Sequence, residues 1–169
     1  MNLELDNKHV LITGGSKGIG LACARGFLAE GARVTLVSRN METLLAAQAT
    51  LIAELGDAGA TAVPSRVNVI AADLRDAVDA QRAVDVIERD FGPVDVLVNS
   101  AGAAKRTPAA ELTAASWHDA MQAKFFTYIH VINPLIKKMG ERGRGAVVNV
   151  IGSGGKVAAV THLAGGSAN

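Results

Sequence analysis

The stretch TGGSKGIG, residues 13–20, places four glycines in eight residues directly after the apolar run VLI at residues 10–12. An apolar run that leads through a glycine-rich turn into a helix can bring backbone N–H groups close to a phosphate. The first glycine lets the chain turn sharply, and Gly18 and Gly20 keep side chains out of the approach path. The spacing departs from the dinucleotide fingerprint G-x-G-x-x-G, because Cys23 stands where the third glycine is expected. We therefore predict a pyrophosphate-binding turn, with a tight turn that binds no ligand as the alternative.

Short apolar runs alternate along the chain with stretches whose apolar residues recur three or four apart, which predicts alternating strands and helices. Strands joined by helices pair in parallel, with helices covering both faces of the sheet. We therefore predict an α/β fold, a doubly wound parallel sheet of order 3-2-1-4-5. The first helix is expected to turn Ile19, Cys23 and Phe27 inward, and the last fifteen residues are expected to form a loop. The predicted strands are residues 8–13, 33–38, 67–72, 94–99 and 146–151.

The composition is typical of one folded domain. A chain of 169 residues, 49% of them hydrophobic, is long enough for a single core and short for two, so we expect residues 1–169 to form a single domain. The formal net charge of +1 gives no reason to expect nucleic acid or a membrane surface as a partner. A single cysteine, Cys23, excludes an internal disulfide and agrees with a reducing compartment. Neither a signal peptide nor a membrane span is readable, so the sequence predicts a soluble cytoplasmic protein.

Three further features favour a dinucleotide. The turn NSAG, residues 99–102, follows the fourth strand, which lies beside the first in this winding, so two turns flank one crevice. Asp73 follows the third strand, where it could accept a hydrogen bond from an adenine amino group. The second strand ends without the Asp or Glu that a free ribose 2′-hydroxyl requires, and Arg39 with Lys17 suits a 2′-phosphate instead. We therefore predict NADP(H) in preference to NAD(H), although Arg39 alone could be a solvated charge at a helix start.

These motifs resemble the short-chain dehydrogenase/reductase family, whose pattern is TGxxxGIG followed by NNAG. The resemblance extends to GPVDVLVNSAG at residues 92–102, to Trp117 ahead of a long helix and to GAVVN at residues 145–149. It implies a Rossmann-type sheet, a nicotinamide cofactor and hydride transfer between an alcohol and a carbonyl. With Lys17 included, the expected cofactor contacts are Gly14, Ser16, Lys17, Gly18, Ile19, Gly20, Arg39, Asp73, Leu74, Asn99, Ala101 and Gly102.

The catalytic positions depart from that family. Its members use a Tyr as general acid and base, a Lys four residues later that depresses the pKa of the Tyr, a Ser that binds the carbonyl oxygen and an Asn that anchors a proton relay. Tyr-x-x-x-Lys is absent here, because Tyr128, the single tyrosine, is followed four residues later by Ile132. Ungapped counting places Lys124 at the position of the Asn, Gly152 at the Ser, Gly165 at the Tyr and Asn169 at the Lys. The alternative is a slip of one or more residues after Gly155, which would move the last two positions beyond residue 169 and leave the first two unchanged.

Three residues are candidate substitutes for the missing groups. Ser153 brings a hydroxyl next to the position of the family's Ser, Lys124 brings a cation to the position of the Asn, and His162 has a pKa suited to proton transfer. The alternative interpretations are a loop hydroxyl, a helix-surface lysine and a surface histidine. No metal site is expected.

The family's fold continues beyond the length of this chain, through the helix with the Tyr and Lys to a further helix and two more strands. We expect the sequence to be a piece of a longer protein, homo-oligomeric in its full-length form, or to be completed by a partner chain, with the fifth strand left as an open edge. The favoured function is an NADP(H)-dependent oxidoreductase acting on a small carbonyl, alcohol or oxoacyl substrate. The alternative is a cofactor-binding family member without catalysis, a sensor or partner subunit; a cofactor-free lyase is disfavoured.

Overall fold

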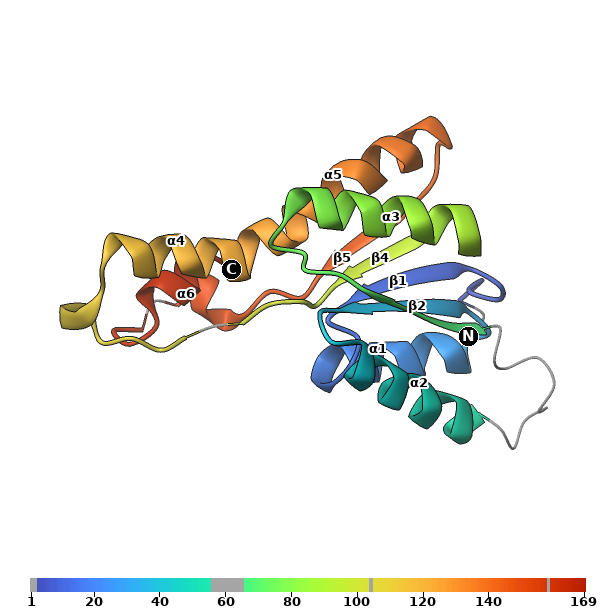
Figure 1. The fold of residues 1–169 in the computed structure, drawn as a ribbon, viewed down its shortest axis with the longest axis horizontal. Coiled ribbons are helices and arrows are strands. Elements are labelled where there is room, and N and C mark those ends of the chain that lie inside the picture. The colour runs from blue at the N-terminus through green and yellow to red at the C-terminus, as the bar shows by residue number, and fades with distance from the viewer. Residues whose placement is uncertain (1–2, 56–65, 104, 158) are drawn as a thin grey trace.

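The computed structural model describes residues 3–55, 66–103, 105–157 and 159–169. Five parallel strands form one sheet in the order β3-β2-β1-β4-β5, which confirms the predicted doubly wound topology (Figure 1). The strands are β1 (His9–Thr13), β2 (Arg33–Ser38), β3 (Val67–Ala71), β4 (Val96–Asn99) and β5 (Ala146–Asn149).

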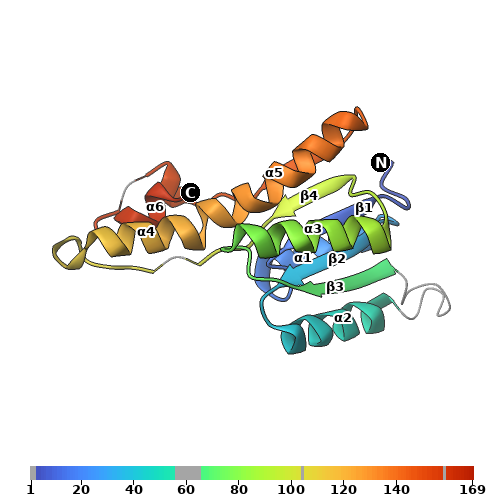
Figure 2. The same ribbon diagram turned by 45° about the horizontal axis from the view of Figure 1, so that its top comes forward.

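Helices cover both faces of this sheet. Figures 1 and 2 place α1 (Gly18–Ala29) and α2 (Met41–Leu55) on one face and α3 (Ala77–Phe91) and α5 (Phe125–Glu141) on the other. Two helices, α4 (Ala114–Ala123) and α6 (Leu163–Ser167), pack together beyond the carboxyl ends of the strands. No helix among the described residues is long and apolar enough to cross a lipid bilayer.

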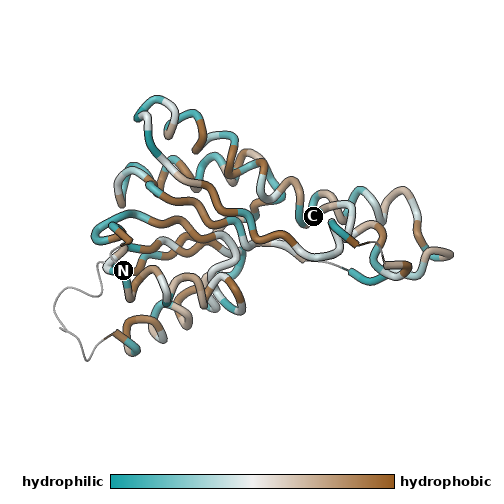
Figure 3. The backbone as a smooth tube through the Cα atoms, turned by 180° about the vertical axis from the view of Figure 1, so that it is seen from behind, coloured by the Kyte–Doolittle hydropathy of each residue, from teal (hydrophilic) through white to brown (hydrophobic). Residues whose placement is uncertain are grey.

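Alternation along the strands divides the core into two layers. Leu11 of β1 packs with the residues of α3 and α5, whereas its neighbours Val10 and Ile12 pack with those of α1 and α2. All three side chains are almost completely buried, because successive residues of a central parallel strand face opposite helical layers. In Figure 3 the strands accordingly form a predominantly hydrophobic centre. The core therefore holds β1 rigidly, and the glycine-rich stretch that follows it starts from a fixed point.

The helix ends follow their sequence signals. Asp76 accepts hydrogen bonds from the backbone N–H groups of Val78 and Asp79 at the start of α3, at 2.7 and 2.9 Å. Asn40 accepts one from the N–H of Thr43 at 2.9 Å. Both residues thus act as N-caps, since a side-chain oxygen there satisfies a donor that the helix leaves unpaired.

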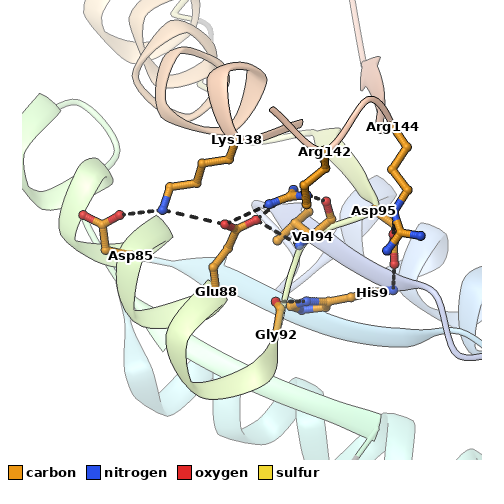
Figure 4. A network of polar contacts seen from close by, with 9 residues as sticks. All are labelled: His9, Asp85, Glu88, Gly92, Val94, Asp95, Lys138, Arg142 and Arg144. Carbon is orange, nitrogen blue, oxygen red and sulfur yellow. Dashed lines mark hydrogen bonds and ion pairs between the residues drawn. The ribbon is translucent and has the colours of Figure 1, made fainter. Parts of the chain in front are cut away.

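A polar network joins α3 and α5 at the amino ends of the strands (Figure 4). Glu88 accepts a hydrogen bond from the N–H of Val94 at 3.0 Å and pairs with Arg142 at 3.1 Å. The same guanidinium donates to the carbonyl of Val94 at 3.1 Å. Lys138 lies 3.7 Å from Glu88 and 3.1 Å from Asp85. The network thus ties both helices to the start of β4, at the end of the sheet away from the glycine-rich loop.

The inner face of α1 differs from the prediction at Ile19, whereas Cys23 and Phe27 pack against the core. Ile19 is 61% exposed, and Cys23 and Phe27 are half-buried. At Gly20, α1 lies too close to the preceding loop for any side chain, since a Cβ would lie 2.5 Å from the carbonyl oxygen of Gly14. The buried residues of α1 are Gly20, Ala24 and Leu28.

Of two predictions for the last third of the chain, one is confirmed and one is wrong. Trp117 lies in α4, ahead of the long helix α5, and Lys124 separates the two helices. Residues 163–167, expected as loop, form the short helix α6. There Gly166 packs so closely on Gly154 that a Cβ would lie 2.7 Å from the carbonyl oxygen of Gly154, and this tertiary contact overrides the low helix propensity of glycine.

The edge of the sheet agrees with the expectation. β5 lies at one edge of the sheet. Val148 within it is 48% exposed, and Ile151 just after it is 61% exposed. Val147, which points to the opposite face, packs against the core residues of α3 and α5. One face of β5 is therefore uncovered and the other is covered.

Candidate functional site

The glycine-rich loop leaves no room for side chains at two positions. Gly14 adopts a positive φ of 66°, and a Cβ there would lie 2.9 Å from the backbone of Ala101. A Cβ on Gly20 would lie 2.5 Å from the carbonyl oxygen of Gly14. The N–H of Gly14 donates to the carbonyl of Val37 at 2.8 Å, which ties the loop to β2. Both glycines are therefore required by close backbone packing, and Gly14 also by its conformation.

The start of α1 is suited to an anion. Within the described residues, Lys17 at the N-cap makes no side-chain capping hydrogen bond and the first turn holds no acidic residue. Gly18 has a φ of 56°, and, apart from its chain neighbours and the backbone of α1, no described atom lies within 4 Å of the position that its Cβ would take. Space is thus open beside Gly18, and the dipole of α1 favours a negative group such as a pyrophosphate at this end of the helix.

The turn after β4 is tied to the loop by Thr13. The buried hydroxyl of Thr13 accepts hydrogen bonds from the N–H groups of Ser100 and Ala101, both at 3.1 Å. The fully buried Asn99 donates from Nδ2 to Asn149 on β5 at 2.9 Å, which links the edge strand to the same turn. The sequence prediction missed this role of Thr13; the signal was its place as the last residue of the first strand.

A cleft of about 580 Å³ lies between the two turns. Three of the predicted cofactor contacts, Gly18, Gly20 and Asn99, do not line it, since Gly20 and Asn99 are buried beneath the turns. The predicted contacts that line it are Gly14, Ser16, Lys17, Ile19, Arg39, Asp73, Leu74, Ala101 and Gly102. The exposure of Ile19 follows from this position, because its side chain forms part of the cleft wall.

One end of the cleft combines hydroxyl and basic groups. The hydroxyls of Ser16 and Ser38 lie 3.4 Å apart, beside the exposed Arg39. Asp73 receives hydrogen bonds from Arg75 Nε at 3.0 and 3.1 Å, and these bonds hold the pKa of the Asp73 carboxyl below its usual value. Arg75, which also lines the cleft, was missed by the sequence prediction, although it stands only two residues after Asp73.

Lys124 lines the other end of the cleft, at the break between α4 and α5. Its ammonium donates to the carbonyl of Val150 and to the hydroxyl of Tyr128, both at 3.0 Å. The Tyr128 hydroxyl in turn donates to the carbonyl of Val150 at 2.7 Å. Burial lowers the pKa of Lys124 and raises the pKa of Tyr128 to about 12. The sequence prediction did not connect the two residues; their spacing of four along a helix was the available signal.

The other two catalytic candidates do not line the cleft. Ser153 is exposed at the start of a single 3-10 turn, Ser153–Gly155. His162 precedes α6 and packs against Gly154 and Gly165. The structure does not bring Ser153, Lys124 and His162 together at the cleft, and it places only Lys124 in its wall.

Two of the replaced family positions do meet. The N–H of Gly152, at the position of the family's Ser, donates to Oδ1 of Asn169, at the position of its Lys, at 3.1 Å.

The part of the chain that the structure describes holds no cluster of three or more His, Cys, Asp or Glu side chains that could bind a metal ion.

Residues 8–167 match the model of the short chain dehydrogenase family. The chain is 37% identical over 164 residues to D-threitol dehydrogenase of Mycolicibacterium smegmatis, covering 96% of this chain and 59% of that protein. It is 37% identical over 147 residues to gluconate 5-dehydrogenase of Gluconobacter oxydans, covering 87% and 54%. The chain therefore belongs to the short-chain dehydrogenase/reductase family, and it spans little more than half the length of these relatives.

A solved structure resembles the fold of this chain. It is an NADPH-bound short chain oxidoreductase from Pseudomonas aeruginosa PAO1, described as containing an atypical catalytic center. It aligns with a TM-score of 0.86 and 30% identity, covering 96% of this chain and 62% of that chain.

Proposed function

We propose that the protein is an NADP(H)-dependent oxidoreductase that transfers a hydride between the nicotinamide and a small carbonyl or alcohol. The observation that carries the proposal is the cleft itself. It joins the uncapped start of α1, where Gly14 and Ile19 line it, to a basic end with Lys17 and Arg39. Such a combination suits a pyrophosphate followed by a ribose 2′-phosphate.

The chain's own residues would hold the cofactor in a definite direction. The first N–H groups of α1 would bind the pyrophosphate, and Arg39 with Lys17 would donate hydrogen bonds to the 2′-phosphate. Asp73 would have to exchange its contact with Arg75 for one with the adenine amino group. The nicotinamide, which supplies or accepts the hydride, would then lie toward Gly102 and Lys124.

The relatives support the reaction class. Two of them are named as dehydrogenases of a polyol and of a sugar acid, and a structural neighbour holds NADPH. We therefore expect the substrate to be a small hydroxylated ketone or its alcohol, and an oxoacyl thioester remains in the test panel because reductases of this family often act on it.

A cofactor-binding protein without turnover is the competing function, motivated by the four replaced catalytic positions. The test is to incubate the protein with NADPH and a panel of keto sugars, keto sugar acids and oxoacyl thioesters, and with NADP⁺ and the corresponding polyols. We expect the absorbance of NADPH to change with at least one substrate. Saturable binding of NADPH with no change above background for any substrate would favour the competing function.

We further propose that the protein is a homo-oligomer. The side chains of Phe125, Ile129 and Ile136 lie on one face of α5 and are 42%, 38% and 53% exposed. Light scattering should therefore give a multiple of the monomer mass, reduced to the monomer mass by Ile136→Glu. A monomer mass for the unmodified protein at micromolar concentration would contradict this proposal.

A further inference from the structure

The residues at the nicotinamide end of the cleft differ from the family in a specific way. Gly152 and Gly165 stand where the Ser and Tyr hydroxyls are expected, and Ser153 is outside the cleft. Among the described residues that line this end, beside Gly102 and Val150, Lys124 carries the ionisable side chain. A proton for the substrate oxygen therefore has one evident source there.

The fold directs Lys124 into the cleft. Its backbone, at φ −130° and ψ −67°, interrupts the helix, so that the carbonyl of Ala123 accepts from the N–H of Ala103 at 3.3 Å. The carbonyl of Lys124 itself accepts from the Thr127 hydroxyl at 2.6 Å. The lysine stem then passes over Gly102, where a Cβ would lie 2.6 Å from Cδ of Lys124. Gly102 is thus the residue that leaves space for this side chain.

Two acceptors bind the ammonium of Lys124 and leave its third hydrogen for a hydrogen bond to the substrate. Lys124 donates to the carbonyl of Val150 and to the hydroxyl of Tyr128, which accounts for two of its three N–H bonds. Tyr128 is 8% exposed and gives its own proton to Val150, so its oxygen offers a lone pair to Lys124. The third N–H belongs to a side chain in the cleft wall, where a substrate oxygen can approach.

We propose that Lys124 is the general acid and base of the site and that Tyr128 is its positioning residue, the reverse of the roles in Tyr-x-x-x-Lys. This inference rests on the proposed oxidoreductase function. During reduction of a ketone, Nζ of Lys124 gives a proton to the carbonyl oxygen as the hydride reaches the carbonyl carbon and the C=O π bond becomes an O–H bond. The neutral amine then recovers a proton from solvent. During oxidation of an alcohol, the neutral amine accepts the hydroxyl proton.

The protonation states agree with this division of roles. Burial lowers the pKa of Lys124, which makes the ammonium a better acid and the amine more accessible near neutral pH. Tyr128, with its pKa raised to about 12, remains a phenol and serves as a fixed hydrogen-bond partner.

The first test compares turnover of three variants with that of the unmodified protein. Lys124→Met removes the proton and should lower kcat by about 10²- to 10⁴-fold, with the dissociation constant of NADPH changed less than threefold. Lys124→Arg keeps the charge but holds its proton too tightly to donate it, so it should be nearly as slow as Lys124→Met. Lys137→Met, at an exposed position of the same helix, is the control and should be fully active. Retention of a tenth or more of kcat by Lys124→Arg would overturn proton transfer by Lys124.

The second test measures the pKa of Lys124 without substrate, from the Cε and Nζ resonances in NMR spectra, assigned through Lys124→Arg. We expect titration below the ordinary lysine value of about 10.4. Tyr128→Phe removes an acceptor that stabilises the ammonium, so it should lower this pKa further and move the alkaline limb of the pH profile of kcat/KM by the same amount. An unchanged pKa and pH profile in Tyr128→Phe would overturn its positioning role.

The outcomes separate this inference from the proposed function. If the unmodified protein reduces a substrate and Lys124→Met does so within threefold of the same rate, the assignment of Lys124 is wrong while the oxidoreductase function stands. If the unmodified protein binds NADPH and reduces nothing, the proposed function fails and the assignment fails with it. Circular dichroism spectra of the variants distinguish either result from misfolding.

Discussion

At the scale of single residues, two glycines of α1 have different roles: Gly20 packs against the cofactor loop, and Gly26 is only part of the helix. Gly20→Ala should lower the free energy of unfolding by about 1–3 kcal/mol, because its Cβ meets the carbonyl of Gly14, and should weaken NADPH binding at least tenfold. Gly26→Ala is the control. Gly26 is exposed in the same helix, and a Cβ there would meet no described atom within 4 Å apart from its chain neighbours and the backbone of α1, so the substitution should raise the free energy of unfolding by about 0.5–1 kcal/mol. Denaturant unfolding and calorimetry measure both effects, and equal behaviour of the two variants would contradict the account.

Arg39 carries the predicted preference for the phosphorylated cofactor. Arg39→Asp should lower the affinity for NADPH at least tenfold, because charge-assisted hydrogen bonds to the 2′-phosphate are lost, and should raise the affinity for NADH, whose free 2′-hydroxyl an Asp can bind. Fluorescence titration with each cofactor measures the ratio. A parallel loss of both affinities would mean that Arg39 shapes the loop and does not distinguish the cofactors.

His9 gives the protein a predictable response to acid. Its ring is fully buried, with Nδ1 donating to the carbonyl of Gly92 at 2.8 Å and Nε2 accepting from Thr35 at 2.9 Å, and burial lowers its pKa. The unfolded chain therefore binds more protons than the folded chain below pH about 6.5. The contribution of neutral His9 to the free energy of unfolding is present above that pH and is lost as the pH falls toward the pKa of His9 in the folded protein. The loss is at most about 1.4 kcal/mol per pH unit. Melting temperatures between pH 5 and 8 check this, with His9→Gln expected to flatten the dependence. A slope that His9→Gln leaves unchanged would assign the effect to other groups.

At the scale of elements, the polar network between α3 and α5 holds the start of β4 in place and contributes to the stability of the fold. Glu88→Ala leaves the N–H of Val94 without its acceptor and Arg142 without its carboxylate partner, so it should lower the free energy of unfolding by about 2–3 kcal/mol. Asp85→Ala removes a carboxylate that is 53% exposed and should cost about 0–1 kcal/mol. Thermal unfolding compares the two. Neither change should alter NADPH affinity, since the network lies at the end of the sheet away from the cleft, and a large loss of affinity would contradict this separation.

The accuracy of the sequence prediction varied among elements for physical reasons. β1 and the strands beside it were predictable because their aliphatic runs are long enough to show burial on both faces. The inner face of α1 was not, because hydropathy ranks Ile19 above Gly20, whereas the close approach of helix to loop selects the residue without a side chain. The break at Lys124 contains neither glycine nor proline, and it depends on hydrogen bonds from Ala103 and Thr127 that no local pattern reveals.

At the scale of the whole molecule, the topology brings both turns to one edge of the sheet, and this could be predicted from the order of strands. The position of Lys124 in the cleft followed from counting along the family pattern, but its partnership with Tyr128 and Val150 required the structure. Ser153 and His162 looked as suitable by residue type. Their places outside the cleft follow from how α6 folds back on residues 152–155, which depends on contacts between glycines.

Because the cleft joins the two halves of the sheet, a bound dinucleotide should stabilise the whole domain. At a free NADPH concentration of 100 times its dissociation constant, the free energy of unfolding should rise by about 2.7 kcal/mol. Differential scanning calorimetry with and without NADPH measures this, and a tenfold weaker affinity in Gly20→Ala should reduce the rise to about 1.4 kcal/mol at the same concentration. An unchanged melting temperature of the unmodified protein under saturating cofactor would contradict binding to the folded state.

The most direct test of the central claim is a calorimetric titration of the protein with NADPH and, separately, with NADH. The account predicts binding of one cofactor per chain, with NADPH bound at least tenfold more tightly than NADH, because Arg39 and Lys17 lie where the 2′-phosphate would be held. Absence of binding by either cofactor would contradict the claim that the glycine-rich loop and the cleft form a dinucleotide site.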